Sequence, residues 1–223
     1  ARQTYGAKKP ILEDQERNPL SYTDLIRAAF ALGRKIAAFT SPGEHVGIML
    51  PASSAAVVTF FALHAFGRTP TRLNFTAGIR NLKAACELSQ VKRVLTSHRF
   101  VEQGKLHDLI DALETLTTVT YLEDVRATVG LSDKLFAAAA GAFPKRFRAA
   151  TKPSDPGVIL FTSGSFGAPK GVVLSQENLI VNVQQVAAHI ALDPAWVMFN
   201  PLPTFHCFGL TGGVMLPILT GMK

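Results

Sequence analysis

Short apolar segments with strand-forming residues alternate with segments of helical periodicity along most of this chain. Residues 45–51, His-Val-Gly-Ile-Met-Leu-Pro, are typical of a parallel strand that is covered on both faces. Strand-like segments follow at 69–74 and 91–96, and helical patterns at about 54–66 and 76–88 separate them. Because parallel strands are joined by right-handed crossovers, this order predicts an α/β protein, a layered α/β/α domain with a mostly parallel sheet.

The remaining elements follow from the same periodicities. Ser21, with Asp24 three positions later, forms a capping box that predicts the start of a helix. The other expected elements are an edge strand near 11–14, a helix from 98 towards 116, strands at 119–122, 157–160, 172–174 and 196–200, and helices at 131–143, 176–192 and 206–219. The basic, proline-flanked stretch 145–152 is typical of a loop, so the candidate subdivision of the 223 residues lies near residue 150.

The segment 161–172, Phe-Thr-Ser-Gly-Ser-Phe-Gly-Ala-Pro-Lys-Gly-Val, has the composition of an anion-binding loop between two strands. Glycine has no side chain to keep a polyanion away, so backbone N–H groups can surround a phosphate, and hydroxyls and an ammonium group add donors. The predicted phosphate ligands are Thr162, Ser163, Gly164, Ser165, Gly167, Lys170 and Gly171. Neither the Walker spacing nor the dinucleotide Gly-x-Gly fits, and the plain alternative is a Gly/Ser hairpin turn with an exposed lysine.

A second constellation lies at 201–210, Pro-Leu-Pro-Thr-Phe-His-Cys-Phe-Gly-Leu, between an expected strand and an expected helix. Ligands of α/β sheets gather at the carboxyl ends of the strands, where we expect both segments. Taken alone, a Phe-His pair in a Pro/Gly-rich turn is more often structural than catalytic. Cys207 has no recognisable base partner for a role as a nucleophile.

Together the two segments resemble those of the adenylate-forming enzymes, which include acyl-CoA synthetases, luciferases and peptide-synthetase adenylation domains. The family loop reads aromatic-Thr-Ser-Gly-Ser/Thr-x-Gly-x-Pro-Lys-Gly-Val, and a Leu-Pro-x-Phe-His-x-x-Gly segment follows its lysine at the distance that separates Lys170 from His206. The resemblance implies that ATP and Mg²⁺ bind here, that His206 contacts the reacting carboxylate, and that Phe205 and Gly209 belong to the substrate site. Many members carry Thr or Ser in place of Phe166, whose side chain offers no hydroxyl to a phosphate.

The resemblance implies a two-step ligase reaction. A carboxylate has no leaving group at neutral pH, so it attacks the α-phosphate of ATP, pyrophosphate leaves, and a thiol then takes the acyl group from the acyl-adenylate. The protein must place two anions together and stabilise the charge on the departing pyrophosphate. Loop amides, hydroxyls and Lys170 suit that task, and Mg²⁺ would neutralise the remaining charge.

Three shorter segments, 73–79, 94–100 and 121–124, are similar to one branch of this family. That branch is the acyl-acyl-carrier-protein synthetase part of bacterial bifunctional 2-acylglycerophosphoethanolamine acyltransferases. The similarity implies that a long-chain fatty acid is activated, loaded onto acyl carrier protein and passed to a lysophospholipid by a parent protein at the cytoplasmic face of the inner membrane. The alternatives are an acyl-CoA ligase, an amino-acid adenylation domain and a non-catalytic nucleotide-binding module.

The family's later motifs, which contact adenine and ribose and include the lysine of the small C-terminal domain, are not found before Lys223. We therefore expect residues 1–223 to be the N-terminal part of the large AMP-binding domain, a cytoplasmic fragment with little or no ligase activity alone.

Composition restricts the partners of the chain. Its 48% apolar and 17% charged residues are typical of a globular protein. The formal net charge is +7, yet of 23 basic residues only Lys152, Lys170 and Lys223 lie beyond position 150. The basic part is either a solvated surface or attracts an acidic carrier protein or an anionic membrane, whereas no motif for nucleic acid accompanies it. Cys86 and Cys207 are isolated, which suits a reducing compartment and predicts no metal site.

Overall fold

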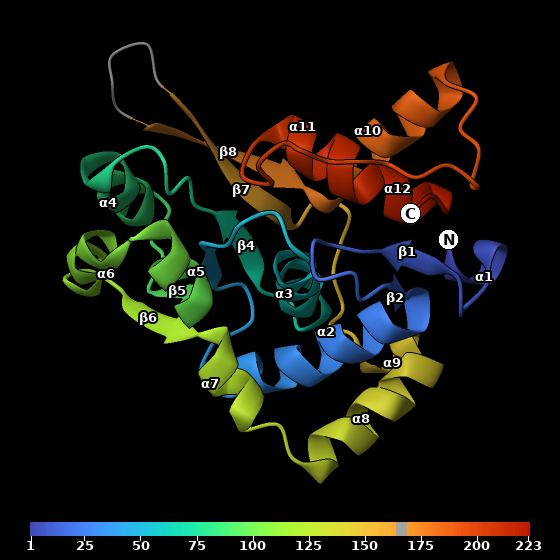
Figure 1. Cartoon of the computed structure of the whole chain (residues 1–223), viewed down its shortest axis with the longest axis horizontal. Coiled ribbons are helices and arrows are strands. Elements are labelled where there is room, and N and C mark those ends of the chain that lie inside the picture. Colours follow the sequence, from blue (N-terminus) through green and yellow to red (C-terminus); the bar gives the residue numbers. More distant parts are fainter. Residues whose placement is uncertain (164–168) are drawn as a thin grey trace.

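A six-stranded sheet organises the molecule, with the strand order β6-β5-β3-β4-β7-β8 (Figure 1). The computed structural model describes residues 1–163 and 169–223. Strands β6 to β7 pair in parallel, and β8 pairs antiparallel with β7. The strands are β3 (His45–Ile48), β4 (Thr69–Arg72), β5 (Arg93–Thr96), β6 (Thr118–Tyr121), β7 (Pro156–Ser163) and β8 (Pro169–Ser175).

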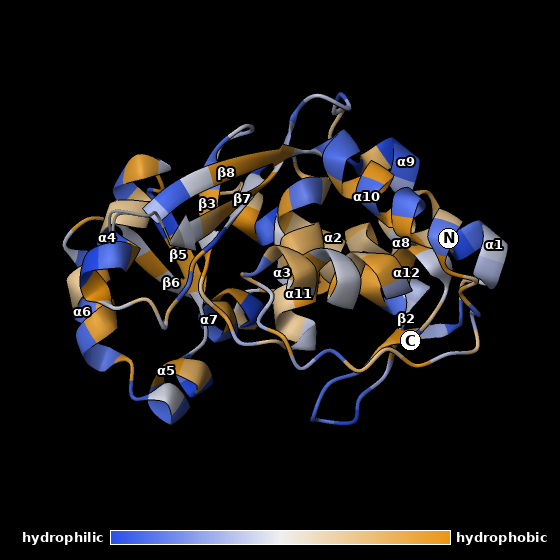
Figure 2. Ribbon diagram, turned by 90° about the horizontal axis from the view of Figure 1, so that it is seen from above, coloured by the Kyte–Doolittle hydropathy of each residue, from blue (hydrophilic) through white to orange (hydrophobic). Residues whose placement is uncertain are grey.

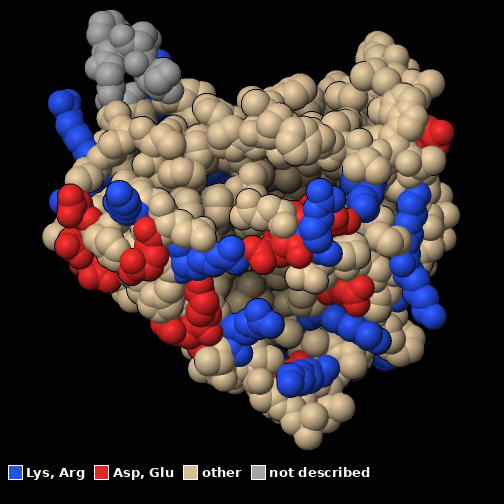
Figure 3. Space-filling view, viewed as in Figure 1, with Lys and Arg blue, Asp and Glu red and all other residues tan. Residues whose placement is uncertain are grey.

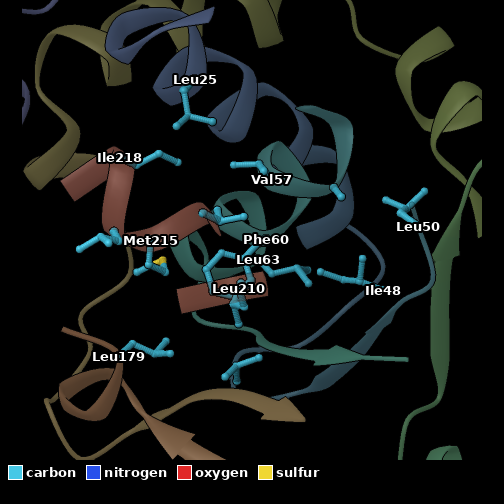
Figure 4. Close-up of a cluster of buried hydrophobic side chains, with 14 of the residues drawn as sticks. Leu25, Ile48, Leu50, Val57, Phe60, Leu63, Leu179, Leu210, Met215 and Ile218 are labelled. Atoms are coloured by element: carbon cyan, nitrogen blue, oxygen red, sulfur yellow. The ribbon is translucent and has the colours of Figure 1, made fainter. Parts of the chain in front are cut away.

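Helices cover both faces of this sheet, so the expected layered α/β/α architecture is confirmed. One face carries α4 (Ile79–Leu88), α5 (His98–Gly104) and α6 (His107–Glu114), whose apolar side chains pack with those of β5 and β6. The other face carries α2 (Tyr22–Ala37), α3 (Ser54–Ala65), α10 (Gln176–His189), α11 (Cys207–Leu210) and α12 (Leu216–Thr220). Figure 4 shows this second core, in which Phe60 and Leu63 of α3 lie among side chains from α2, β3 and the C-terminal helices.

The starts of the two central helices follow directly from the local sequence. The Ser21 hydroxyl accepts the Asp24 N–H at 3.2 Å, and the Asp24 carboxylate accepts the Ser21 N–H at 3.0 Å, which confirms the capping box of α2. Ser53 caps α3 through the N–H of Ala56. Helix α3 is apolar all round because it lies between α2 and the sheet, and Figure 2 shows its hydrophobic ribbon in the middle of the molecule.

Smaller elements surround this three-layered unit. Helix α8 packs on the outer side of α2, where the Asp133 carboxylate lies 2.8 Å from the Lys35 ammonium group. The ion pair and the hydrogen bond from the Gly130 N–H hold the pKa of Asp133 below its usual value. These outer elements are α1 (Arg2–Tyr5), β1 (Pro10–Leu12), β2 (Leu20–Ser21), α7 (Leu122–Ala127), α8 (Leu131–Ala142) and α9 (Pro144–Phe147).

Three expectations about the elements were wrong. The first residues of the stretch 145–152, expected as a loop, belong to α9. The helix expected over 98–116 is divided into α5 and α6, because Lys105 adopts the left-handed conformation, with φ of 50°, and ends α5. The segment 196–200 is not a strand; its backbone is bonded to Lys223, whose carbonyl accepts the Met198 N–H at 2.6 Å. The expected helix at 206–219 is present, with the π-helical turn η1 (Thr211–Met215) between α11 and α12.

The charged side chains are unevenly distributed over the surface. On the face shown in Figure 3, Lys and Arg are interspersed with Asp and Glu over the lower half, and few charged groups lie over β8 and the C-terminal helices. Arg99 and Glu16, for example, form an ion pair at 2.7 Å. The positive charge therefore does not form one continuous patch on this face. Within residues 1–163 and 169–223, no helix has both the length and the apolar character needed to cross a bilayer.

Candidate functional site

The loop predicted to bind phosphate joins the adjacent ends of β7 and β8. Strand β7 runs parallel to β4, so its last residues lie at the carboxyl edge of the sheet. Thr162 lies opposite Lys170 in the register of β7 and β8, and both side chains are exposed. A hydroxyl and an ammonium group therefore flank the loop at the edge where ligands of α/β folds bind.

Of the other predicted loop ligands, some belong to the described strands and some lie outside the described residues. Ser163 ends β7 and lies opposite Pro169. Gly164, Ser165 and Gly167 lie outside the described residues, as does Phe166.

Gly171 belongs to β8, where it lies opposite Phe161. A Cβ atom at Gly171 would lie 3.4 Å from the Phe161 ring, an ordinary contact. The packing of β8 therefore does not itself require a glycine at this position.

The His206 segment lies against the carboxyl end of β4, the strand next to β7. The Arg72 Nε donates to the Thr204 carbonyl oxygen at 3.1 Å, across 132 residues of sequence. The Phe205 ring, only 5% exposed, lies edge-on to Phe75 with 5.2 Å between ring centroids. The structure thus brings the second predicted segment to the same sheet edge as the loop.

Arg72 is a site residue that the sequence did not reveal. It ends β4, is only 2% exposed, and burial lowers the pKa of its guanidinium to about 10. At neutral pH it is therefore a cation beneath the His206 segment. In the sequence it stands as an ordinary arginine after Thr-Pro-Thr, and its burial follows only from the tertiary packing.

His206 and Gly209 have different positions at the start of α11. His206 is exposed and is the N-cap residue of this helix, and its N–H donates to the Pro203 carbonyl at 3.1 Å. Gly209 is buried, and a Cβ atom there would lie 2.2 Å from the same carbonyl oxygen. The close approach gives Gly209 a packing role, while its contact with substrate stays a prediction.

The three short segments that narrowed the resemblance lie together at this edge. Residues 73–79 follow β4, residues 94–100 span the end of β5, and residues 121–124 span the end of β6. Phe75 and Phe100 pack at 4.9 Å between ring centroids, and His98 stacks on Tyr121 at 3.7 Å. The Ser97 hydroxyl donates to Glu123 at 2.6 Å. They form one continuous strip beside the His206 segment, which we call the carboxyl-edge strip (residues 73–79, 94–100 and 121–124).

A small cleft of about 100 Å³ lies between α4 and the ends of β7 and β8. Asn74, Asn81 and Thr162 line it together with the Phe161 ring. Its volume is below the range of about 300–1,000 Å³ that is usual for ligand pockets, so these described residues would hold only part of a nucleotide. The amide and hydroxyl groups of Asn74, Asn81 and Thr162 are donors of the kind that a phosphate accepts. No cluster of three His, Cys, Asp or Glu side chains that could hold a metal occurs in the described part of the chain.

The class follows from the fold, whose mostly parallel sheet with helices on both faces matches the N-terminal domain of adenylate-forming enzymes. ATP-bound MatB from Rhodopseudomonas palustris superposes on 97% of the chain, with a TM-score of 0.79 and 22% identity, and the chain covers 41% of that protein. The chain belongs to the AMP-binding enzyme family, whose model matches residues 1–223.

Two curated relatives represent different thiol acceptors. The chain is 30% identical over 209 residues to 4-coumarate–CoA ligase 2 of Oryza sativa subsp. japonica, an alignment that covers 87% of the chain and 36% of the rice protein. It is 38% identical over 71 residues to the medium-chain-fatty-acid–[acyl-carrier-protein] ligase TtuA of Teredinibacter turnerae, covering 32% of the chain and 11% of TtuA. The chain spans about a third of the length of the curated relatives that it matches over most of its own length.

Proposed function

We propose that the protein containing this chain is an ATP-dependent acid–thiol ligase, which activates a long-chain fatty acid as the acyl-adenylate and transfers it to acyl carrier protein. The observation that carries this proposal is the proximity of two segments distant in sequence. The segment of His206 lies against β4, and the neighbouring β7 leads into the loop between Thr162 and Lys170. An enzyme that joins a carboxylate to a nucleotide phosphate needs two such anion sites side by side.

The residues of this edge have separate roles in the proposal. Thr162, Lys170 and the loop between them hold the polyphosphate, and the Lys170 ammonium group stabilises the negative charge that grows on departing pyrophosphate. His206 contacts the carboxylate from the exposed N-cap of α11, and Phe205 forms a wall of the substrate site. Mg²⁺, when bound with ATP, would supply the remaining positive charge.

The proposal also specifies the thiol acceptor. The carboxyl-edge strip supports acyl carrier protein, because all three of its segments resemble the carrier-protein branch and lie beside His206. The relation to TtuA supports the same acceptor. Coenzyme A is the second candidate, because the rice relative, named a CoA ligase, aligns over a much larger share of the chain.

The proposal takes its cellular setting from the carrier-protein branch of the family. In this proposal residues 1–223 are the N-terminal part of the large domain, inactive alone, and the groups that bind adenine and ribose lie in the rest of the protein. The acyl group passes from the carrier protein to a lysophospholipid at the cytoplasmic face of the bacterial inner membrane.

Mass spectrometry of the acceptor tests the proposal. The full-length protein is incubated with ATP, Mg²⁺, palmitate and holo acyl carrier protein, with coenzyme A in a parallel tube. We expect an added palmitoyl mass on the carrier protein, whereas palmitoyl-CoA beside an unchanged carrier would support the second candidate. Lys170→Ala should abolish either product, and Lys152→Ala, which replaces another exposed lysine, should not. Absence of adenylate and thioester in both tubes would favour a non-catalytic nucleotide-binding module.

A further inference from the structure

A second, larger cavity lies at the opposite edge of the sheet from the candidate site. It has a volume of about 410 Å³, is open to solvent on one side, and is lined by residues of α1, α2, α3, α9, α10 and α12. Gln176 lines it and donates to the carbonyl of Pro156, the first residue of β7, at 3.4 Å. The cavity is therefore at the amino edge, whereas the loop and the His206 segment are at the carboxyl edge.

The wall of this cavity is apolar and its volume falls within the usual range for ligand pockets, about 300–1,000 Å³. The lining side chains come from six helices that are distant in sequence, so the cavity is a gap in the packing between elements. The apolar side chains that line it include Leu25, Ile26, Phe30, Phe61, Ile218 and Leu219. Such a wall favours the burial of a hydrocarbon chain.

Basic groups form the rim of the cavity, with no acidic group among its lining residues. The rim carries Arg2, Lys145 and Arg148. None of the three is in an ion pair with a carboxylate of the described residues. The Arg2 Nε is inaccessible to solvent and has no hydrogen-bond partner within that part of the chain. Three cations without a counter-charge around an apolar hollow favour an anionic head group.

Neutral polar groups lie deeper in the same wall. His64 Nδ1 and the Gln176 amide nitrogen are 3.0 Å apart, so with the amide as donor the imidazole proton is on Nε2. The Nε2 atom is inaccessible to solvent and has no hydrogen-bond partner in the described chain. Burial lowers the pKa of His64 to about 4. The ring is thus uncharged at neutral pH and leaves the positive charge at the rim.

We propose that this cavity binds a single-chain amphiphilic anion, with its alkyl chain among the apolar side chains of α2, α3 and α12 and its head group at Lys145 and Arg148. This is a second acyl-binding site, separate from the catalytic edge, and it does not depend on ligase activity. It also gives a role to the basic stretch 145–152, whose first residues form α9 rather than a loop. A carboxylate and a phosphate head share the chemistry required.

Photo-crosslinking in the full-length protein tests the site directly. A decanoate that carries a diazirine on its chain is bound and irradiated, and peptide mass spectrometry locates the adducts. We expect adducts in peptides covering 22–30 and 144–151, and about tenfold less labelling there in Lys145→Glu/Arg148→Glu, because charge-assisted contacts are lost. Arg146→Glu is the matched control, since Arg146 is exposed on the same helix but does not line the cavity, and its labelling should change less than about twofold.

Competition in the unmodified protein tests the same site without any substitution. Octanoate, decanoate and dodecanoate should compete with about a fourfold gain for each buried methylene group. Monodecyl phosphate against decanoate identifies the preferred head group, and decanol should compete at least about tenfold less well than the better of the two.

The labelling pattern distinguishes this cavity from the ligase site at the carboxyl edge. Lys170→Ala should leave the labelling of 22–30 and 144–151 unchanged, whatever its effect on adenylation. The inference is overturned if adducts appear only around 205–209, if decanol competes as well as both anions, or if Arg146→Glu loses as much labelling as the double variant.

Discussion

Replacing Gly209 by alanine tests whether the packing at the start of α11 positions His206. A Cβ atom at this position would lie 2.2 Å from the Pro203 carbonyl oxygen and 3.1 Å from the Leu202 carbonyl oxygen. Ordinary contacts begin near 3.4 Å, so α11 and the Pro203 carbonyl would have to separate by roughly 1.2 Å, the difference between 3.4 and 2.2 Å. Both obstacles are backbone atoms and cannot rotate away as a side chain would.

We expect Gly209→Ala to lower both the stability of the fold and the rate of adenylation. Overpacking of this kind costs typically about 1–3 kcal/mol, and for a domain of this size each kcal/mol lowers Tm by about 2–4 °C. The same displacement moves the N-cap residue His206, whose N–H is bonded to the Pro203 carbonyl. A shift of about 1 Å in a positioning group can reduce the rate about a hundredfold. We therefore expect a folded variant with a modestly lower Tm and a large loss of adenylation.

The assay is ATP–pyrophosphate exchange in the full-length protein with palmitate, together with a thermal denaturation curve. The matched control is Gly212→Ala, because a Cβ at Gly212 would lie 3.6 Å from the Phe208 ring, an ordinary contact. The control should keep its exchange rate within a few-fold and its Tm. Exchange at the parental rate in Gly209→Ala, or an equal loss in both variants, would refute the argument that this close approach positions His206.

Three further predictions concern the stability of the described fold. Ser21→Ala removes the cap of α2 and should lower the free energy of unfolding by about 1 kcal/mol and Tm by about 2–4 °C, measured by thermal denaturation; an unchanged Tm would contradict the capping box. Phe205→Ala should cost about 3–5 kcal/mol in urea denaturation, because the ring is buried against Phe75, and a loss below about 1 kcal/mol would contradict that packing. Burial lowers the pKa of His64 from 6.5 to about 4, so the unfolded chain binds more protons between these values. The free energy of unfolding should therefore fall as pH falls through this window, by up to about 3 kcal/mol, and His64→Gln should lack this part of the slope in urea titrations at several pH values.

Local sequence predicted the elements whose determinants are local. The capping box at Ser21 and the apolar run that became β3 each contain their own signals, and both were confirmed. The division between α5 and α6 was missed because it depends on one residue, Lys105, in a left-handed conformation that few non-glycine residues adopt. The segment 196–200 has strand-like composition but is not a strand, since a strand requires a neighbour that pairs along its length. Among the described residues, its backbone is bonded to Lys223 and, within the same turn, to Asp193, and no neighbouring segment pairs along its length.

The sequence predicted where the candidate site lies but not all of the residues that form it. The phosphate loop follows β7 as expected, and ligands gather at the carboxyl edge of such a sheet. The His206 segment lies at the same edge, although the strand expected before it at 196–200 is not formed. The contact that holds the His206 segment against β4 could not be expected, because it depends on the burial of Arg72 and on its bond to Thr204, 132 residues away. The cavity at the amino edge was also missed, since its wall comes from six separate helices and only its basic residues at 145–148 stand out in the sequence.

The choice of arginine at position 72 is best understood from the charges that the proposed reaction brings together. A guanidinium that is only 2% exposed loses most of its hydration, and one hydrogen bond to the Thr204 carbonyl offsets only part of that cost. An apolar side chain could fill the same space without this penalty. A buried cation does, however, raise the electrostatic potential at the carboxyl edge, where water screens it poorly. In the proposed reaction a carboxylate and a polyphosphate, both anions, must approach each other there. Arg72 would then reduce their mutual repulsion while its hydrogen bond to the Thr204 carbonyl holds the neighbouring His206 in position.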